Sequence, residues 1–235
     1  MRRALLIVVA AFLAASASAC SGPDAQEAQA LLAESNAAFA QVRSATFTAR
    51  LTVTGGPTTF SMTLNGGGYA HGKRAGDTYV LVTGDGLPFN EVAMIKRHGR
   101  TVMRVDGHAI PVPAPPAPAA NPLQLVDLAD YVNDVHVDHG KVLESESEPL
   151  AKVTAVLDTG ALAEGALAQL ASGTDGFDLS AVLGDTRVVL YLSERTHLPK
   201  RGLLDFALKV GDQKIDMHMD FAYTSYNKRV EFPSL

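Results

Sequence analysis

The chain has 235 residues, of which 47% are hydrophobic, and its formal net charge is −5 at pH 7. An acidic chain of this kind is a poor ligand for nucleic acid, so we expect no nucleic-acid partner. The length is sufficient for one sizeable hydrophobic core. Because Cys20 is the only cysteine, that core must hold without an intramolecular disulfide.

The first nineteen residues have the layout of an export signal. Arg2 and Arg3 form a basic start, residues 4–13 (ALLIVVAAFL) are an unbroken apolar run, and small residues lead to Cys20. The apolar run is shorter than the roughly 20 residues that span a bilayer, so we expect it to be cleaved. Residues 17–20 (ASAC) resemble a bacterial lipobox. That resemblance implies a lipidated Cys20 that carries acyl chains such as palmitate, whereas ordinary cleavage after Ala19 is the alternative.

Acylation of Cys20 would determine the location of the mature chain in the cell. Two or three acyl chains hold a protein on a bilayer durably, so we expect an exported protein at the outer face of the cell membrane. Residues 20–24 would be the lipidated tether, and residues 25–235 would be a single domain.

A helix is predicted over residues 25–43. Asp24 and Glu27 have the spacing of a capping box. The apolar residues Ala28, Leu31, Leu32, Phe39 and Val42 then recur at helical spacing, which predicts an apolar stripe that packs against a sheet.

Strands are predicted through most of the remaining chain. Residues 45–53 and 60–64 alternate between apolar and polar residues and are joined by a Gly-Gly-Pro turn, which predicts a hairpin. Further strands are expected at 67–74, 78–83, 91–97, 101–106 and 151–157, and helices at 121–131 and 159–170. Half of the twelve prolines lie between 111 and 122, so that stretch is predicted to be an extended surface segment.

The C-terminal third has the clearest strand signal, over residues 186–193, 201–210 and 214–225. In the last of these, Ile215, Met217, Met219, Phe221 and Tyr223 share one face. The predicted sheet is therefore apolar along one side. Its opposite side carries Asp216, His218 and Asp220.

The order of these elements resembles the LppX/LprA/LprF/LprG group of actinobacterial lipoproteins. The most specific stretches are residues 187–192 (RVVLYL), 197–200 (HLPK) and 223–233 (YTSYNKRVEFP). The resemblance covers the whole chain after the signal, and the group has no common catalytic residue to match.

The resemblance implies the α+β fold of the LolA/LolB lipoprotein carriers. In that fold a strongly curved antiparallel sheet forms an open half-barrel, and helices cover its concave apolar face around a lipid-binding cavity. We expect the cavity to be lined by Phe47, Leu51, Phe60, Met62, Leu64, Leu167, Leu190, Met217, Met219 and Phe221. The methionines suit a surface that accepts acyl chains of varied shape, and an ordinary packed core is the alternative interpretation.

Three polar groups are candidate sites. His136, Asp138 and His139 have ligand-type side chains that could hold zinc, but no third histidine is spaced nearby, so a solvated loop or edge is favoured and no metal is expected. Asp216, His218 and Asp220 are explained by a polar outer face. The basic hairpin with Lys96, Arg97, His98, Arg100 and Arg104 could contact phosphate headgroups, or is a solvated hairpin tip.

The sequence therefore predicts a lipid-binding protein of the cell envelope that carries or presents a lipid or acylated glycolipid. No nucleophile elbow, metalloprotease motif, phosphate loop or dinucleotide motif is present, so neither an enzyme nor a cofactor is expected. An envelope sensor or interaction module of the same fold is the alternative. We expect a monomer, with an envelope export transporter as a candidate partner.

Overall fold

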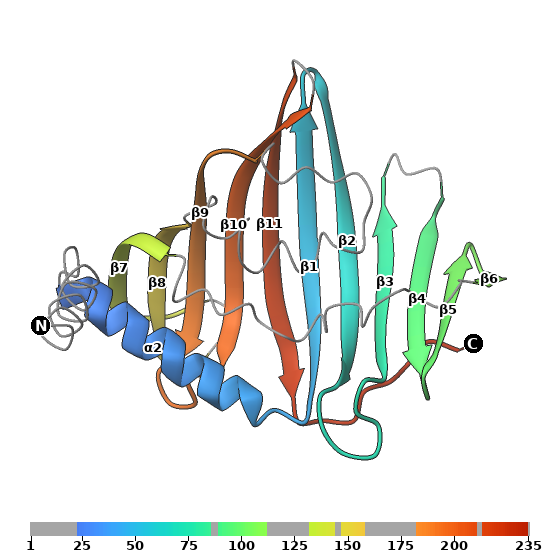
Figure 1. The fold of residues 1–235 in the computed structure, drawn as a ribbon, viewed down its shortest axis with the longest axis horizontal. Helices are drawn as coiled ribbons and strands as arrows, with labels where there is room; N and C mark the ends of the chain where they lie inside the picture. Colours follow the sequence, from blue (N-terminus) through green and yellow to red (C-terminus); the bar gives the residue numbers. More distant parts are fainter. Residues whose placement is uncertain are drawn as a thin grey trace, which may run out of the picture.

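The computed structural model describes residues 23–85, 89–111, 132–143, 147–157, 182–210 and 213–234. Within these residues the chain forms one helix and eleven strands (Figure 1). The helix is α2 (Pro23–Ala40), and the strands are β1 (Ser44–Gly55), β2 (Thr58–Tyr69), β3 (Thr78–Gly84), β4 (Glu91–Arg97), β5 (Arg100–Val105), β6 (His108–Pro111), β7 (Val132–Lys141), β8 (Leu150–Leu157), β9 (Val182–Ser193), β10 (Pro199–Val210) and β11 (Gln213–Tyr226).

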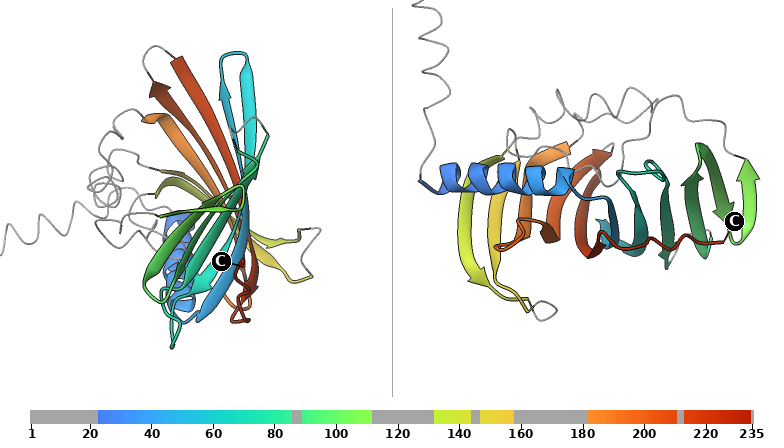
Figure 2. Two further views of the ribbon diagram at one scale, coloured as in Figure 1. Left: turned by 90° about the vertical axis from the view of Figure 1, so that its right-hand side faces the viewer. Right: turned by 90° about the horizontal axis from the view of Figure 1, so that it is seen from below.

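All eleven strands belong to one antiparallel sheet. Their order is β6-β5-β4-β3-β2-β1-β11-β10-β9-β8-β7, so the first and last thirds of the chain meet where β1 pairs with β11. The sheet is twisted and open, with β6 and β7 as its two edges in the described part of the chain (Figures 1 and 2). This arrangement fits the predicted open half-barrel.

Helix α2 lies along one side of the sheet, as the right-hand view of Figure 2 shows. Its buried residues Ala28 and Leu32 pack in one cluster with Val153 of β8 and with Val188 and Leu190 of β9. The apolar stripe read from the sequence therefore does contact the sheet. The helix begins two residues earlier and ends three residues earlier than predicted.

A second cluster follows the end of the helix. Val42 and Ala45 are buried against Phe39, Tyr223 and Tyr226, and the ring centroids of Phe39 and Tyr223 lie 5.6 Å apart. Three aromatic rings thus fix the point where α2 passes into β1.

Two aromatic rings on the helix side lie directly over glycines of the neighbouring strand. A Cβ added at Gly202 would lie 2.2 Å from the ring of Phe221, and one added at Gly66 would lie 2.4 Å from the ring of Phe47. No larger residue fits under these rings in their present positions, so each glycine is needed for this packing.

The C-terminal segment covers part of the other side of the sheet. The ring of Phe232 stacks on Tyr69 and meets Tyr79 edge-on, with centroids 6.3 and 5.5 Å away. Ile95 and Ala93, which lie on the same face of β4 as Tyr79 does on β3, are buried. Both faces of β4 are consequently apolar.

Most predicted strands are present, with bounds that differ by a few residues. The strand predicted at 67–74 is wrong, because residues 67–69 are the end of β2 and the chain turns away after Tyr69. Gly72 and Gly76 have φ of +88° and +81°, which is a turn conformation and not that of a strand.

Strands β6 and β7 were not predicted. The His136 to His139 stretch, expected to be a loop or an edge, lies in β7 and is the edge of the sheet. The predicted helices at 121–131 and 159–170 lie outside the described residues. Helical cover of the apolar face is therefore described for α2 alone.

Candidate functional site

One face of the sheet carries apolar side chains on every strand. Antiparallel partners point to the same side, and the register places the following residues together from β7 to β6: Val137, Val153, Leu190, Leu204, Met219, Leu51, Met62, Val82, Met94, Met103 and Ile110. We call this the apolar face. It is the face on which α2 packs.

The predicted site residues converge on this face in cross-strand rows. Leu51 pairs with Met62 on one side and with Met219 on the other. The neighbouring rows are Phe60, Val53 and Met217, then Leu64, Ala49 and Phe221. Phe47 and Leu190 belong to the same face, whereas Leu167 lies outside the described residues.

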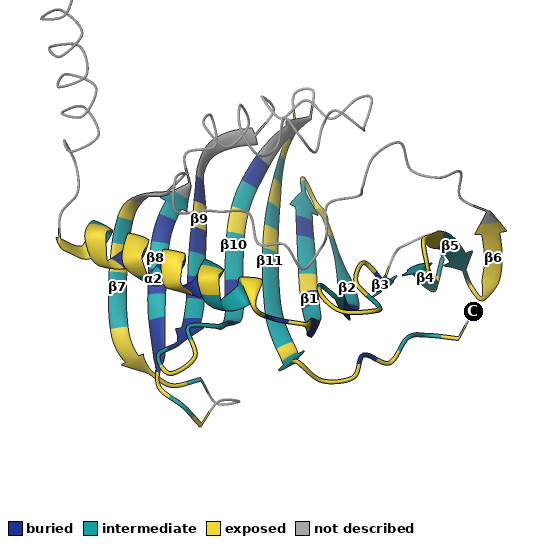
Figure 3. Cartoon of the chain, turned by 60° about the horizontal axis from the view of Figure 1, so that its bottom comes forward, coloured by how far each residue is buried: buried dark blue, intermediate teal, exposed yellow. Residues whose placement is uncertain are grey.

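The described strands range from buried residues near α2 to exposed residues at the β6 edge (Figure 3). Leu190 and Val188, under the helix, are 6% and 4% exposed, whereas Met94 and Ile110, near the β6 edge, are 50% and 41% exposed. Leu51, Met62 and Met219 are half-buried. The described residues therefore leave a broad apolar surface only partly covered.

Tyr223 lies at the end of the apolar face that is nearest the turn between α2 and β1. Its ring stacks on Tyr226 with a centroid distance of 5.2 Å and meets Phe221 edge-on. Burial raises the pKa of Tyr223 to about 12, so its hydroxyl stays protonated well into the alkaline range. An apolar ligand on the neighbouring residues would meet no charge there.

The sequence analysis did not identify the contribution of β3 to β6 to the apolar face. Val82, Met94, Met103 and Ile110 extend the apolar face, yet none was proposed as a site residue. Alternation in β4 is masked because Ala93 and Ile95 are also apolar and are buried under the C-terminal segment. The methionines at 94 and 103 were the sequence feature that could have indicated the extension of the apolar face into β4 and β5.

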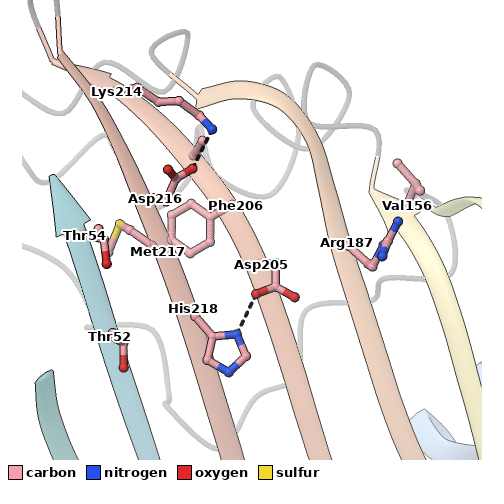
Figure 4. A pocket seen from close by; sticks show the side chains of 11 residues that line it. Thr52, Thr54, Val156, Arg187, Asp205, Phe206, Lys214, Asp216, Met217 and His218 are labelled. Atoms are coloured by element: carbon pink, nitrogen blue, oxygen red, sulfur yellow. Dashed lines mark hydrogen bonds and ion pairs between the residues drawn. The ribbon is translucent and has the colours of Figure 1, made fainter. Parts of the chain in front are cut away.

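The opposite face is polar over its central strands, and it supplies most of the residues that line a hollow of about 600 Å³ (Figure 4). Asp205 and His218 line it and are joined by a 2.5 Å contact between Oδ1 and Nδ1, and Lys214 lies 2.7 Å from Asp216. Of the predicted cavity residues, only Met217 is among those described as lining this hollow.

The candidate metal ligands on β7 are engaged in ion pairs instead. His136 Nδ1 lies 3.1 Å from Asp24 of α2, and His139 Nε2 lies 2.8 Å from Glu27. In the described part of the chain, no three His, Cys, Asp or Glu side chains are grouped so that they could hold a metal ion. These histidines connect β7 to α2.

No family model matches the chain, and no curated protein matches it. Among solved structures, the chain is similar to LprF from Mycobacterium bovis, with 13% identity and a TM-score of 0.49 over 91% of this chain and 99% of LprF. It is also similar to lipoprotein LppX from Mycobacterium tuberculosis, with 13% identity and a TM-score of 0.46 over 86% of this chain and 97% of LppX. A third is a LolA superfamily protein from Nitrosomonas europaea, with 8% identity and a TM-score of 0.28 over 87% and 94%. LprF and LppX both belong to the group that the sequence resembles, as predicted.

Proposed function

We propose that this chain is an exported lipoprotein that binds the acyl chains of a lipid or acylated glycolipid on its apolar face, and carries or presents that lipid at the cell envelope. The observation that supports this best is the unbroken apolar face across eleven strands, whose half-buried centre is built from Leu51, Met62 and Met219. In soluble proteins, a contiguous apolar surface that is only partly covered often marks a binding site.

The residue types on the face suit a ligand of variable shape. Methionine has an unbranched, polarizable side chain that adjusts to irregular surfaces, and Met62, Met94, Met103, Met217 and Met219 all lie on this face. Acyl chains differ in length and unsaturation, so a surface that adapts accommodates more of them than a rigid one.

The proposed anchor is close to helix α2 in sequence. Cys20 lies three residues before Pro23, where α2 begins, so an acylated Cys20 would be within about 10 Å of the helix. That distance would hold the protein at the membrane surface. No helix among the described residues is long and apolar enough to cross a bilayer.

The test is to purify the full chain from a host that makes envelope glycolipids, and to analyse it by native mass spectrometry and by mass spectrometry of an organic extract. We expect a bound lipid in stoichiometric amount. A chain that carries no lipid, and that takes up no fluorescent fatty acid, would contradict lipid binding. Such a chain, if it instead captured an envelope protein, would support the sensor alternative.

A further inference from the structure

Four segments that are distant in sequence meet at one end of the sheet. They are the turn between α2 and β1, the loop between β2 and β3, the turn between β4 and β5, and the C-terminal segment (Figure 1). Hydrogen bonds hold them together. The amide of Arg43 donates to Asn227 Oδ1 at 2.7 Å, the amide of His98 donates to Asp77 Oδ1 at 2.8 Å, and the amide of Val230 donates to the Tyr69 hydroxyl at 2.9 Å.

Two adjoining pockets lie between these segments, with volumes of about 310 and 370 Å³. They share Arg74 and Arg229. The cationic side chains that line them come from three of these segments and from the end of β4, and are Arg43, Lys73, Arg74, Arg97, Lys228 and Arg229. We call this group the basic end.

The basic end has more positive than negative charge. Asp77 is buried and bound to Arg74 at 3.2 Å, and Glu231 is the one acidic residue among the described lining. In the described part of the chain, Lys73, Lys228 and Arg229 form no ion pair. Other cations of this acidic protein do have acidic partners, for example Arg201 with Asp220 and Lys200 with Glu148.

Two of the guanidinium groups are fixed in place before any ligand arrives. Arg74 lies over the rings of Tyr69 and Phe232, 4.4 and 4.8 Å from their centroids, and Arg97 lies 5.4 Å from the Phe232 centroid. The Nε of Arg97 is buried with no hydrogen-bond partner. Positioned guanidinium groups with donors to spare bind phosphate oxygens well, because the planar fork matches the spacing of two oxygens.

We propose that the basic end is a phosphate-binding site. Phosphate oxygens are offered both by the headgroup of an anionic phospholipid and by free phosphate. The site is distinct from the apolar face, so its occupancy does not depend on the proposed lipid cargo. The basic hairpin noted in the sequence contributes Arg97 to it, while the other five cations come from outside that hairpin.

The experiment compares two double charge reversals in the full chain, with Cys20→Ala in every sample so that the N-terminus contributes equally. Lys73→Glu with Arg229→Glu removes the basic end. Lys141→Glu with Lys214→Glu makes the same change of net charge on β7 and β11, away from these pockets. Inorganic phosphate is titrated by calorimetry, and vesicles of phosphatidylcholine, with or without phosphatidylglycerol, are sedimented at about 0.05 M and about 0.5 M salt.

We expect the basic-end variant to lose at least about tenfold in binding to phosphatidylglycerol vesicles at low salt, and the control variant to keep it. Phosphate binding without vesicle binding would retain the site and assign it to free phosphate. Equal losses in both variants, or no binding of either probe by the parent chain, would overturn the proposal. The neutral double variant Lys73→Gln with Arg229→Gln controls for misfolding, and circular dichroism checks its fold. It should show a smaller loss of vesicle binding than the charge reversal does.

Discussion

His139 Nε2 lies 2.8 Å from Glu27 Oε1 and joins the edge strand β7 to helix α2. The same histidine contacts Glu194 through Nδ1 at 3.1 Å. The two other acidic residues of α2 have histidine partners as well, since Asp24 contacts His136 and Glu34 contacts His197. The helix is therefore held over the apolar face by its apolar stripe and by three contacts between a histidine and a carboxylate.

The first prediction concerns pH. Hydrogen bonds to Glu27 and Glu194 raise the pKa of His139. A raised pKa means that the contact stabilises the fold fully below the unfolded value of about 6.5, and that this stabilisation is lost as pH rises through the folded value. Because the side chain is half exposed, the effect is at most about 1 kcal/mol.

Thermal unfolding of His139→Gln should therefore show a lower Tm than the parent at about pH 5.5, and an equal Tm at about pH 8.5. The other titratable or charged groups on β7 and at the start of α2 are Asp24, His136, Asp138 and Lys141. His108→Gln, in strand β6 at the opposite edge, is the control and should leave Tm unchanged at both pH values. A destabilisation of His139→Gln that is independent of pH would refute a role for the charged form.

The second prediction separates an open apolar face from a packed core. Met219→Trp adds bulk where the side chain is half-buried, so it should keep the parent stability and reduce uptake of a fluorescent lipid. Val188→Trp, under α2 and 4% exposed, should lose about 1–3 kcal/mol from overpacking. If Met219→Trp destabilises the fold as much as Val188→Trp does and leaves lipid uptake intact, the face is an ordinary core.

The third prediction concerns the aromatic rings that lie over glycines. Gly202→Ala would bring a Cβ within 2.2 Å of the Phe221 ring, so the ring must move and the fold should lose about 1–3 kcal/mol. Gly55→Ala is the matched change, since its Cβ would lie 3.6 Å from Ile215, which is ordinary contact. Denaturant unfolding should show a reduced midpoint for Gly202→Ala alone, and equal midpoints would mean that the Phe221 ring is free to shift.

The fourth prediction concerns the anchor. Cys20→Ala removes the thiol that the lipobox-like sequence would acylate, so the variant should incorporate no labelled fatty acid, while the parent should. The variant should also leave the membrane fraction or keep its N-terminal segment. Fatty-acid labelling that persists in Cys20→Ala would place the acylation elsewhere.

The sequence was most informative where one face of a strand is apolar and the other is polar. In β11 the alternation of Met217 and Met219 with Asp216 and His218 predicted the strand and its orientation correctly. In β4 that contrast is absent, because Phe232 and its neighbours cover the second face. Which residues of β4 lie on the apolar face is therefore known only from the pairing of β4 with β3.

The basic end could not be read from the sequence for a different reason. Arg43 and Asn227 touch although 184 positions separate them, and β1 pairs with β11 across almost the whole chain. A local pattern shows one basic hairpin, but the charge of a surface depends on which distant segments share it. Such long-range contacts arise because the sheet order makes β1 and β11 neighbours. No single stretch of the sequence shows that pairing.

The two edges of the sheet bear on how the molecule behaves at high concentration. Strand β6 is only four residues long and ends at Pro111, which has no amide hydrogen to offer. Strand β7 is interrupted by register shifts on both sides of His136 to Asp138, and Asp134 has a φ of +45°. Irregular or donor-poor edges resist the addition of a strand from a second molecule. We expect this sheet, despite its length and its apolar face, to withstand edge-to-edge aggregation.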